Sequence, residues 1–261
     1  MAKLSKADAA KHLRALSLLA KDTLTMDERW DVLESYQEGA VHMNGLAGAF
    51  FTPAGLARDL AIEVPGCSRI LDLCAGIGTL AFMATMSARM GRGHMPEIVC
   101  VEANGDYIAA GCKLLPEATW IHADAFEAND LGHFDVAIAN PPFGSIRHGG
   151  KPRRYGGPEF ELRLIDLASD LADYGVFLVP QMSAPFSYSG KRSFEETPSP
   201  RMERFGAETG IVLEPSCGID TSFYRTDWHG VAPAVEVVCA DFIEARRRRA
   251  PAQRSLFESA A

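Results

Sequence analysis

The sequence predicts a doubly wound α/β fold with a mostly parallel sheet, on three observations. Short apolar runs bounded by turn residues alternate with longer amphipathic runs between residues 69 and 180. Such alternation is typical of βαβ units, in which helices cover both faces of a parallel sheet. The first core turn is rich in glycine, and polar residues directly follow several of the apolar runs. Strands that end in this way place polar groups at a ligand-binding edge.

The elements are expected in a definite order along the chain. Two amphipathic helices come first, over 6–20 and 26–38, and Thr25 can cap the second. A third helix follows over 56–64, opened by Thr52 and Pro53 because proline suits the first helical turn. Core strands are expected over 69–73, 97–102, 119–122, 134–139 and 176–179, with helices over 78–90, 104–115 and 159–174. Two later strands over 210–215 and 234–242 are expected to pair, and 144–158 and 181–200 are expected to be irregular.

Composition excludes several classes of protein. The chain has 261 residues, 47% of them hydrophobic and 23% charged, with a net charge of −8. No apolar run is long enough to span a membrane, and the first residues lack the apolar core of a secretory signal. The 6 cysteines form no C-x-x-C pair, so neither a disulfide framework nor a metal site is expected. We therefore expect a cytoplasmic protein without a membrane partner.

The turn after the first core strand predicts a cofactor site. Its glycines, Gly76 and Gly78, let the backbone approach a ligand closely, and the next helix points its N-terminus there. The spacing also fits the fingerprint of nicotinamide or flavin dinucleotides, with Glu102 in the position of the ribose-binding acid. An unliganded tight turn is a further alternative.

Three acidic residues at strand ends favour S-adenosylmethionine over a dinucleotide. Asp72 can pair with an ammonium group, which this methyl donor has, whereas a pyrophosphate would be repelled. Glu102 can accept hydrogen bonds from ribose hydroxyls, and Asp124 can accept one from an adenine amino group beside Phe126. The alternatives are a turn cap for Asp72 and a solvated strand end for Glu102.

The strand over 134–139 ends directly in the motif Asn140-Pro141-Pro142-Phe143. Consecutive prolines stiffen this turn and fix the carbonyl of Pro141 beside the side-chain oxygen of Asn140. Together these two oxygens can accept both hydrogens of a planar amino group, and Phe143 can stack on the attached ring. The alternative is an ordinary Asn-Pro turn with a core phenylalanine.

These motifs resemble those of S-adenosylmethionine-dependent amino-methyltransferases, most of all the N6-adenine DNA methyltransferases of the gamma motif order. In that family, Asn140–Phe143 corresponds to the catalytic motif and 72–78 to the donor-binding motif. The segment 48–53 resembles the Phe-x-Thr-Pro segment that closes over the methionine part of the donor. The resemblance covers about 50–179 and more loosely reaches 242. It implies a seven-stranded sheet of the Rossmann-like methyltransferase type.

The resemblance also implies a set of site residues. Those expected around the donor are Phe51, Thr52, Pro53, Asp72, Cys74, Ala75, Gly76, Gly78, Thr79, Glu102, Ala103, Asp124, Ala125, Phe126 and Asn140. Pro141, Pro142 and Phe143 complete the catalytic motif. A basic, glycine-rich loop follows, and its Arg147, Lys151, Arg153, Arg154 and Tyr155 are expected to contact DNA.

The implied activity is methyl transfer to the N6 amino group of adenine in DNA, in a duplex with the base flipped out or in a single strand. The chain would comprise a helical extension over 1–45, a methyltransferase domain over 46–245 and a basic, poorly ordered tail over 246–261. DNA contacts are expected from 144–158 and 181–209. No large target-recognition domain and no nuclease motif is evident, which favours a solitary enzyme over one half of a restriction-modification pair.

Three alternatives to this activity stay open. Asn-Pro-Pro-Phe/Tyr motifs also occur in methyltransferases that act on RNA or on a protein glutamine. A catalytically inactive protein that binds only the donor or nucleic acid is a further reading. A nicotinamide oxidoreductase would leave Asn140–Phe143 unexplained.

Overall fold

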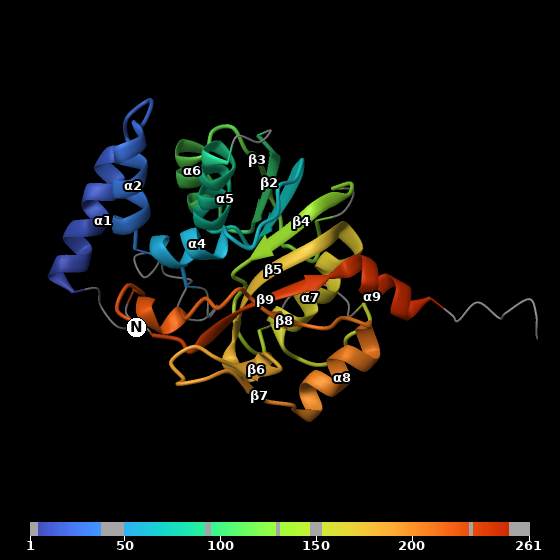
Figure 1. Ribbon diagram of the computed structural model, residues 1–261. Coiled ribbons are helices and arrows are strands. Elements are labelled where there is room, and N and C mark those ends of the chain that lie inside the picture. Colours follow the sequence, from blue (N-terminus) through green and yellow to red (C-terminus); the bar gives the residue numbers. More distant parts are fainter. Residues whose placement is uncertain are drawn as a thin grey trace, which may run out of the picture.

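The computed structural model describes residues 5–37, 50–91, 95–128, 131–146, 153–229 and 232–250. Its central feature is a seven-stranded sheet in the order β3-β2-β1-β4-β5-β9-β8 (Figure 1). The parallel strands are β1 (Arg69–Leu73), β2 (Glu97–Glu102), β3 (Thr119–His122), β4 (Phe134–Ala139) and β5 (Ala172–Pro180). The strands β9 (Val235–Asp241) and β8 (Glu214–Pro215) continue the sheet in antiparallel pairing. The predicted fold class and the pairing of the last two strands are confirmed.

Helices cover both faces of the sheet (Figure 1). On one face lie α1 (Lys6–Leu19), α2 (Met26–Ser35), α4 (Ala54–Leu60), α5 (Thr79–Met90) and α6 (Gly105–Leu114). On the other lie α7 (Phe160–Leu171), α8 (Pro200–Thr209) and α9 (Phe242–Arg249). The short elements are η2 (Gln181–Ser183), η3 (Thr221–Tyr224) and the hairpin of β6 (Phe186–Ser187) and β7 (Glu195–Glu196). No helix in the described part of the chain is long and apolar enough to cross a membrane.

Successive residues of the central strands point to opposite faces of the sheet, and each face has its own hydrophobic core. In β1, Ile70 packs in the core under α5, whereas Leu71 packs in the core under α7. Val176 and Phe177 divide in the same way in β5. Both faces of each strand are therefore buried, which explains why these strands are continuously apolar in the sequence.

The two N-terminal helices form as expected and pack beside α6 and α5. Thr25 caps α2 in a reciprocal capping box with Glu28. Lys113 of α6 donates to the carbonyl oxygens of Lys21 (2.8 Å) and Asp22 (3.2 Å) in the turn between the helices. The extension therefore lies against the sheet domain, and its boundary at residue 45 falls outside the described residues.

Two element predictions need correction. The helix expected over 159–174 ends at Leu171, because the chain from Ala172 onward pairs with β4 and then with β9. The helix α8 was not expected: it follows the stretch 181–200, which contains only short elements, and it forms the last third of the segment 181–209 from which DNA contacts are expected. Ser199 caps α8, Pro200 stands in its first turn and Gly210 ends it at φ 68°. These residues are a recognisable start and stop signal.

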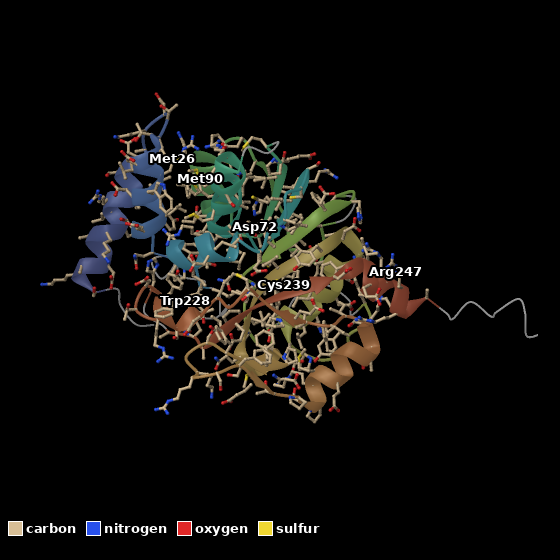
Figure 2. All side chains as sticks on the ribbon, in the orientation of Figure 1. Met26, Asp72, Met90, Trp228, Cys239 and Arg247 are labelled. Carbon is tan, nitrogen blue, oxygen red and sulfur yellow. The ribbon has the colours of Figure 1, made fainter. Side chains whose placement is uncertain are left out.

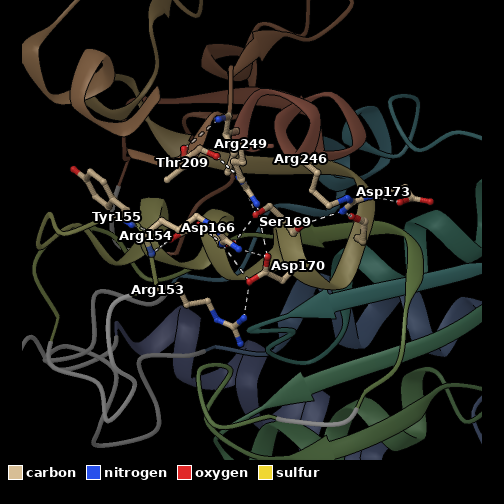
Figure 3. A network of polar contacts seen from close by, with 12 residues as sticks. Arg153, Arg154, Tyr155, Asp166, Ser169, Asp170, Asp173, Thr209, Arg246 and Arg249 are labelled. Atoms are coloured by element: carbon tan, nitrogen blue, oxygen red, sulfur yellow. Dashed lines mark hydrogen bonds and ion pairs between the residues drawn. The ribbon is translucent and has the colours of Figure 1, made fainter. Parts of the chain in front are cut away.

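The basic run near the C-terminus is also different from expectation. Residues 246–249 are the last turns of α9, which docks on α7 (Figure 3). Arg246 donates to the carbonyl oxygens of Ser169 (2.9 Å) and Ala172 (2.7 Å). Arg249 donates to the hydroxyl of Ser169 (2.7 Å) and to the carbonyl oxygen of Thr209. These guanidinium groups therefore join two helices and are not part of a loose tail.

Two arginines of α9 offer a matched test of this docking. Arg249→Ala should lower the free energy of unfolding by about 1–3 kcal/mol, because partly buried hydrogen bonds to α7 and α8 are lost. Arg247 is 74% exposed and contacts only Glu244 at 3.5 Å among the described residues. Arg247→Ala should therefore change stability by less than about 0.5 kcal/mol. Urea denaturation measures both, and equal effects would contradict the docking role.

Candidate active site

The residues predicted for chemistry meet at one edge of the sheet. Asp72 lies near the end of β1, Glu102 ends β2, and Asn140 directly follows β4. These three strands are neighbours, with β1 in the middle. Because they are parallel, their carboxyl ends bring the three polar side chains to the same edge.

Asp72 is a buried carboxyl group with an incomplete set of hydrogen bonds. Its side chain lies inside the molecule (Figure 2), and the residue is 1% exposed. Oδ2 accepts a hydrogen bond from the amide of Ala81 at 3.2 Å. Oδ1 is buried and has no partner in the described structure. Burial, together with the nearby Glu102, raises the pKa of Asp72 to about 8.

The glycine turn between β1 and α5 depends on backbone that other residues rarely adopt. Gly76 has φ 58° and Gly78 φ 86°. A Cβ on Gly76 would lie 3.0 Å from the Phe51 ring, and one on Gly78 would lie 2.9 Å from the Trp120 ring. Cys74, at φ 59°, is the one described residue other than glycine with positive φ. Because its glycines have no side chains, the turn places backbone atoms directly beside the site, as the close approach of a ligand requires.

Glu102 holds this turn in place. Its Oε2 accepts a hydrogen bond from the Gly76 amide and its Oε1 one from the Asn104 amide, each at 2.8 Å. Burial raises the pKa of Glu102, and the two amides act in the opposite direction. A carboxylate has about four lone-pair sites, so ribose hydroxyls can still bind. The ribose contact stays a prediction.

The segment after β3 forms a compact turn. Asp124 Oδ1 accepts a hydrogen bond from the Phe126 amide at 2.8 Å, and Ala125 is buried. The Phe126 ring meets Phe160 edge-on, with centroids 5.1 Å apart. Ala103 is exposed on the neighbouring strand end. An adenine contact by these residues stays a prediction.

Asn140 has its amide nitrogen fully engaged and its oxygen free. Nδ2 donates to the carbonyl oxygen of Phe50 (2.8 Å) and to the hydroxyl of Thr52 (2.9 Å). Oδ1 is buried and has no partner in the described structure. Pro141 is buried, and Pro142 and Phe143 are half-buried.

Glu161 is a site residue that the sequence analysis missed. It is 1% exposed in the first turn of α7, and its Oε2 accepts a hydrogen bond from the Gly144 amide at 2.9 Å. Its Oε1 accepts one from the Ser183 hydroxyl at 2.7 Å. Glu161 therefore anchors the residue that follows Phe143. A glutamate early in a helix carries no signal in the sequence for this distant contact.

Many of the predicted residues line one cavity of about 20 Å³. It is large enough for about one water molecule. A ligand of nucleoside size needs more room than this cavity provides, and the Phe51 ring lies against Gly76 at its edge. The lining consists of Phe50, Phe51, Thr52, Asp72, Cys74, Ala75, Gly76, Thr79, Leu80 and Asn140. A larger cavity of about 470 Å³ beside Cys67 and Ser68 lies at the opposite end of β1, away from these groups.

The predicted DNA-contact residues are only partly described, because Arg147 and Lys151 fall outside the described residues. Arg153 pairs with Asp170 (2.6 Å), and Arg154 pairs with Asp166 (2.9 Å) and Asp170 (2.6 Å) on α7 (Figure 3). These ion pairs compensate much of the positive charge that the sequence places in the loop.

Tyr155 requires a correction. The residue is 1% exposed, and its hydroxyl donates to Glu159 at 2.7 Å. Its ring meets Phe205 of α8 edge-on, with centroids 5.3 Å apart. In this structure the tyrosine is a core residue packed between the start of α7 and α8, so the expected contact with DNA would require it to leave that core.

The protonation state of Asp72 should make the free energy of unfolding depend on pH. Its pKa rises from the ordinary 3.8 to about 8 on folding, so ionisation costs the folded protein free energy as the pH rises between these values. Wild-type protein should therefore lose stability relative to Asp72→Asn between pH 5 and pH 8. Urea denaturation without added ligand measures this difference. If wild-type protein and Asp72→Asn differ in free energy of unfolding by the same amount at both pH values, Asp72 is not protonated in the folded protein.

No protein-family profile matches the chain, and no curated protein does. Solved structures do match. A proposed class I S-adenosylmethionine-dependent methyltransferase from Listeria monocytogenes is 12% identical, with 91% of this chain and 81% of that chain covered and a TM-score of 0.59. A type I restriction-modification methyltransferase subunit from Streptococcus thermophilus is also 12% identical, with 81% and 49% covered and a TM-score of 0.51.

The type IIG restriction endonuclease BpuSI is 16% identical, with 83% of this chain and 27% of that chain covered and a TM-score of 0.51. This chain thus spans half or less of the two restriction-system proteins. At these identities the likeness concerns the fold. The chain has the Rossmann-like, seven-stranded fold of S-adenosylmethionine-dependent methyltransferases.

Proposed function

We propose that this protein transfers a methyl group from S-adenosylmethionine to the N6 amino group of adenine in DNA. One observation carries the proposal. Asp72 Oδ1 and Asn140 Oδ1 are buried, lack partners in the described structure and come from residues that line the same cavity. Buried polar atoms without partners cost free energy, so such a pair indicates ligands that bring charged or hydrogen-bonding partners to both oxygens.

The chemistry of the methyl donor, S-adenosylmethionine, fits the residues on the β1 and β2 side of the site. The ammonium group of the methionine part suits Asp72, which becomes ionised when it pairs with a cation. The close backbone at Gly76 suits a ligand that passes over the turn, and Glu102 suits the ribose. A dinucleotide is disfavoured because its pyrophosphate would meet both carboxyl groups.

The acceptor chemistry fits the β4 side. S-adenosylmethionine, when bound, supplies an electrophilic methyl group. Asn140 Oδ1 and the Pro141 carbonyl accept the two hydrogens of the adenine amino group, which directs the nitrogen lone pair at that methyl group. The N–C bond that forms would replace the S–C bond of the sulfonium, which leaves as a neutral thioether, and the methylated nitrogen would lose one of its protons to solvent. Phe143 stacks on the flipped base, a contact worth about 1–3 kcal/mol. Rate enhancement then comes from positioning and from preorganised acceptors.

DNA is favoured over other acceptors by sequence and by the names of relatives. Phe51-Thr52-Pro53 resembles the segment of adenine DNA methyltransferases, and two structures with this fold are named for restriction systems. Because Arg153 and Arg154 pair with α7, phosphate contacts in this loop would fall to Arg147 and Lys151. RNA and protein glutamine are the outcomes that the substrate assay must separate.

Methyl transfer should depend on Asn140. We expect labelled S-adenosylmethionine to give N6-methyladenine in DNA, detected by mass spectrometry of nucleosides, and Asn140→Ala to reduce the rate about 10²–10³-fold. Donor and DNA should still bind, as calorimetry would show. RNA and a glutamine peptide are assayed in parallel. Methylation of RNA or peptide alone would overturn the DNA assignment, and wild-type rates in Asn140→Ala would overturn the mechanism.

Donor binding should release a proton from Asp72. With a pKa of about 8, the group is protonated in most free molecules at pH 6.5, and pairing with the ammonium ionises it. Donor affinity should therefore rise with pH up to about 8. Calorimetry in two buffers of different ionisation enthalpy counts the protons. Asp72→Asn should bind more weakly and release none, and identical heats for wild-type protein in both buffers would refute this coupling.

A further inference from the structure

The contact between Asn140 and the segment before α4 determines which way the amide of Asn140 faces. Phe50 offers a backbone carbonyl, which can only accept a hydrogen bond. Nδ2 must therefore face it, since the opposite orientation would place two acceptor oxygens together. The orientation of this amide thus follows from the chemistry of its neighbour.

The Thr52 hydroxyl oxygen accepts a hydrogen bond from the same amide nitrogen of Asn140. The nitrogen carries two hydrogens, and the second contact is the Thr52 hydroxyl at 2.9 Å. Both amide hydrogens are then used on the side of residues 50–52, and Oδ1 is left as the free acceptor on the other side. With the hydroxyl removed, one buried hydrogen would lack a partner and the amide could tilt.

The position of Thr52 has no other evident explanation in local structure. A threonine just before a helix usually caps it. Here α4 has Pro53 at its N-cap and no side-chain capping bond, although Thr52 is only 6% exposed. The hydroxyl is instead turned to Asn140, which lies 88 residues further along the chain.

We propose that Thr52 is a positioning residue for methyl transfer, which keeps Asn140 Oδ1 directed at the acceptor amino group. This inference rests on the proposed function. It replaces the expectation that Thr52 mainly contacts the donor. It also gives the Phe51-Thr52-Pro53 segment two tasks: the Phe51 ring covers the glycine turn, and the Thr52 hydroxyl holds the catalytic amide.

Kinetics of two Thr52 variants separate positioning from donor binding. Thr52→Val keeps the shape of the side chain and removes the acceptor, so kcat should fall at least roughly fivefold while the donor Kd stays within about twofold. Thr52→Ser retains a hydroxyl and should restore kcat. A raised donor Kd with unchanged kcat would overturn the proposal, because Thr52 would then be a donor contact.

A second measurement does not need activity. In protein with ¹⁵N-labelled asparagine, the Asn140 side-chain amide is assigned by its loss in Asn140→Asp. Its hydrogens should exchange slowly with solvent in wild-type protein and in Thr52→Ser, and at least roughly tenfold faster in Thr52→Val. Thr85→Val is the matched control, since Thr85 is 1% exposed and its hydroxyl donates to the Ala81 carbonyl within α5.

The two measurements distinguish the possible failures. If wild-type protein methylates no acceptor, the proposed function fails, and the exchange rates still decide whether Thr52 holds Asn140. If exchange in Thr52→Val matches wild type, or if Thr85→Val accelerates it equally, the positioning role is wrong even in an active methyltransferase.

Discussion

Two buried oxygen atoms that find no partner among the described residues, Asp72 Oδ1 and Asn140 Oδ1, are the constraint around which the site is built. Burial takes each oxygen out of bulk water, and the described residues supply no hydrogen bond in return, which costs free energy. The sheet holds both oxygens in this position despite the cost in free energy. β1 and β4 are adjacent central strands with both faces packed, so their carboxyl ends are rigid and the two oxygens cannot turn away to solvent.

The groups around these oxygens are themselves held by hydrogen bonds. Glu102 ties the glycine turn to β2, the Phe50–Thr52 segment fixes the amide of Asn140, and Glu161 anchors Gly144. The three anchors come from different parts of the chain. Each leaves the ligand-facing atoms in a defined orientation, which is the preorganisation that electrostatic catalysis requires.

Several basic residues that cluster in the sequence make contacts within the protein. Arg153, Arg154, Arg246 and Arg249 occur in two basic clusters along the chain, and all four contact α7 (Figure 3). The acids that pair with them are Asp166 and Asp170 on α7 and Asp173 in β5, which are separated along the sequence and face the arginines only in the folded chain. These ion pairs and hydrogen bonds dock α9 and the end of the loop, so these four basic residues are engaged within the protein.

The sequence by itself determined the fold class, the order of the core strands along the chain and the identity of the central polar residues. These depend on local signals: continuous apolar strands, positive-φ glycines at 76 and 78, and the prolines after Asn140. The ends of α8, at Ser199 and Gly210, carry such local signals as well.

Only the tertiary structure decided which atoms of those residues are free. Whether Asp72 keeps one unpaired oxygen, which way Asn140 faces and what Glu161 and Thr52 hold all depend on contacts between distant segments. The burial of Tyr155 against Phe205 and the docking of Arg249 on α7 depend on them too. Hydrogen-bond partners and burial are properties of packed neighbours, and no local pattern in the sequence encodes them.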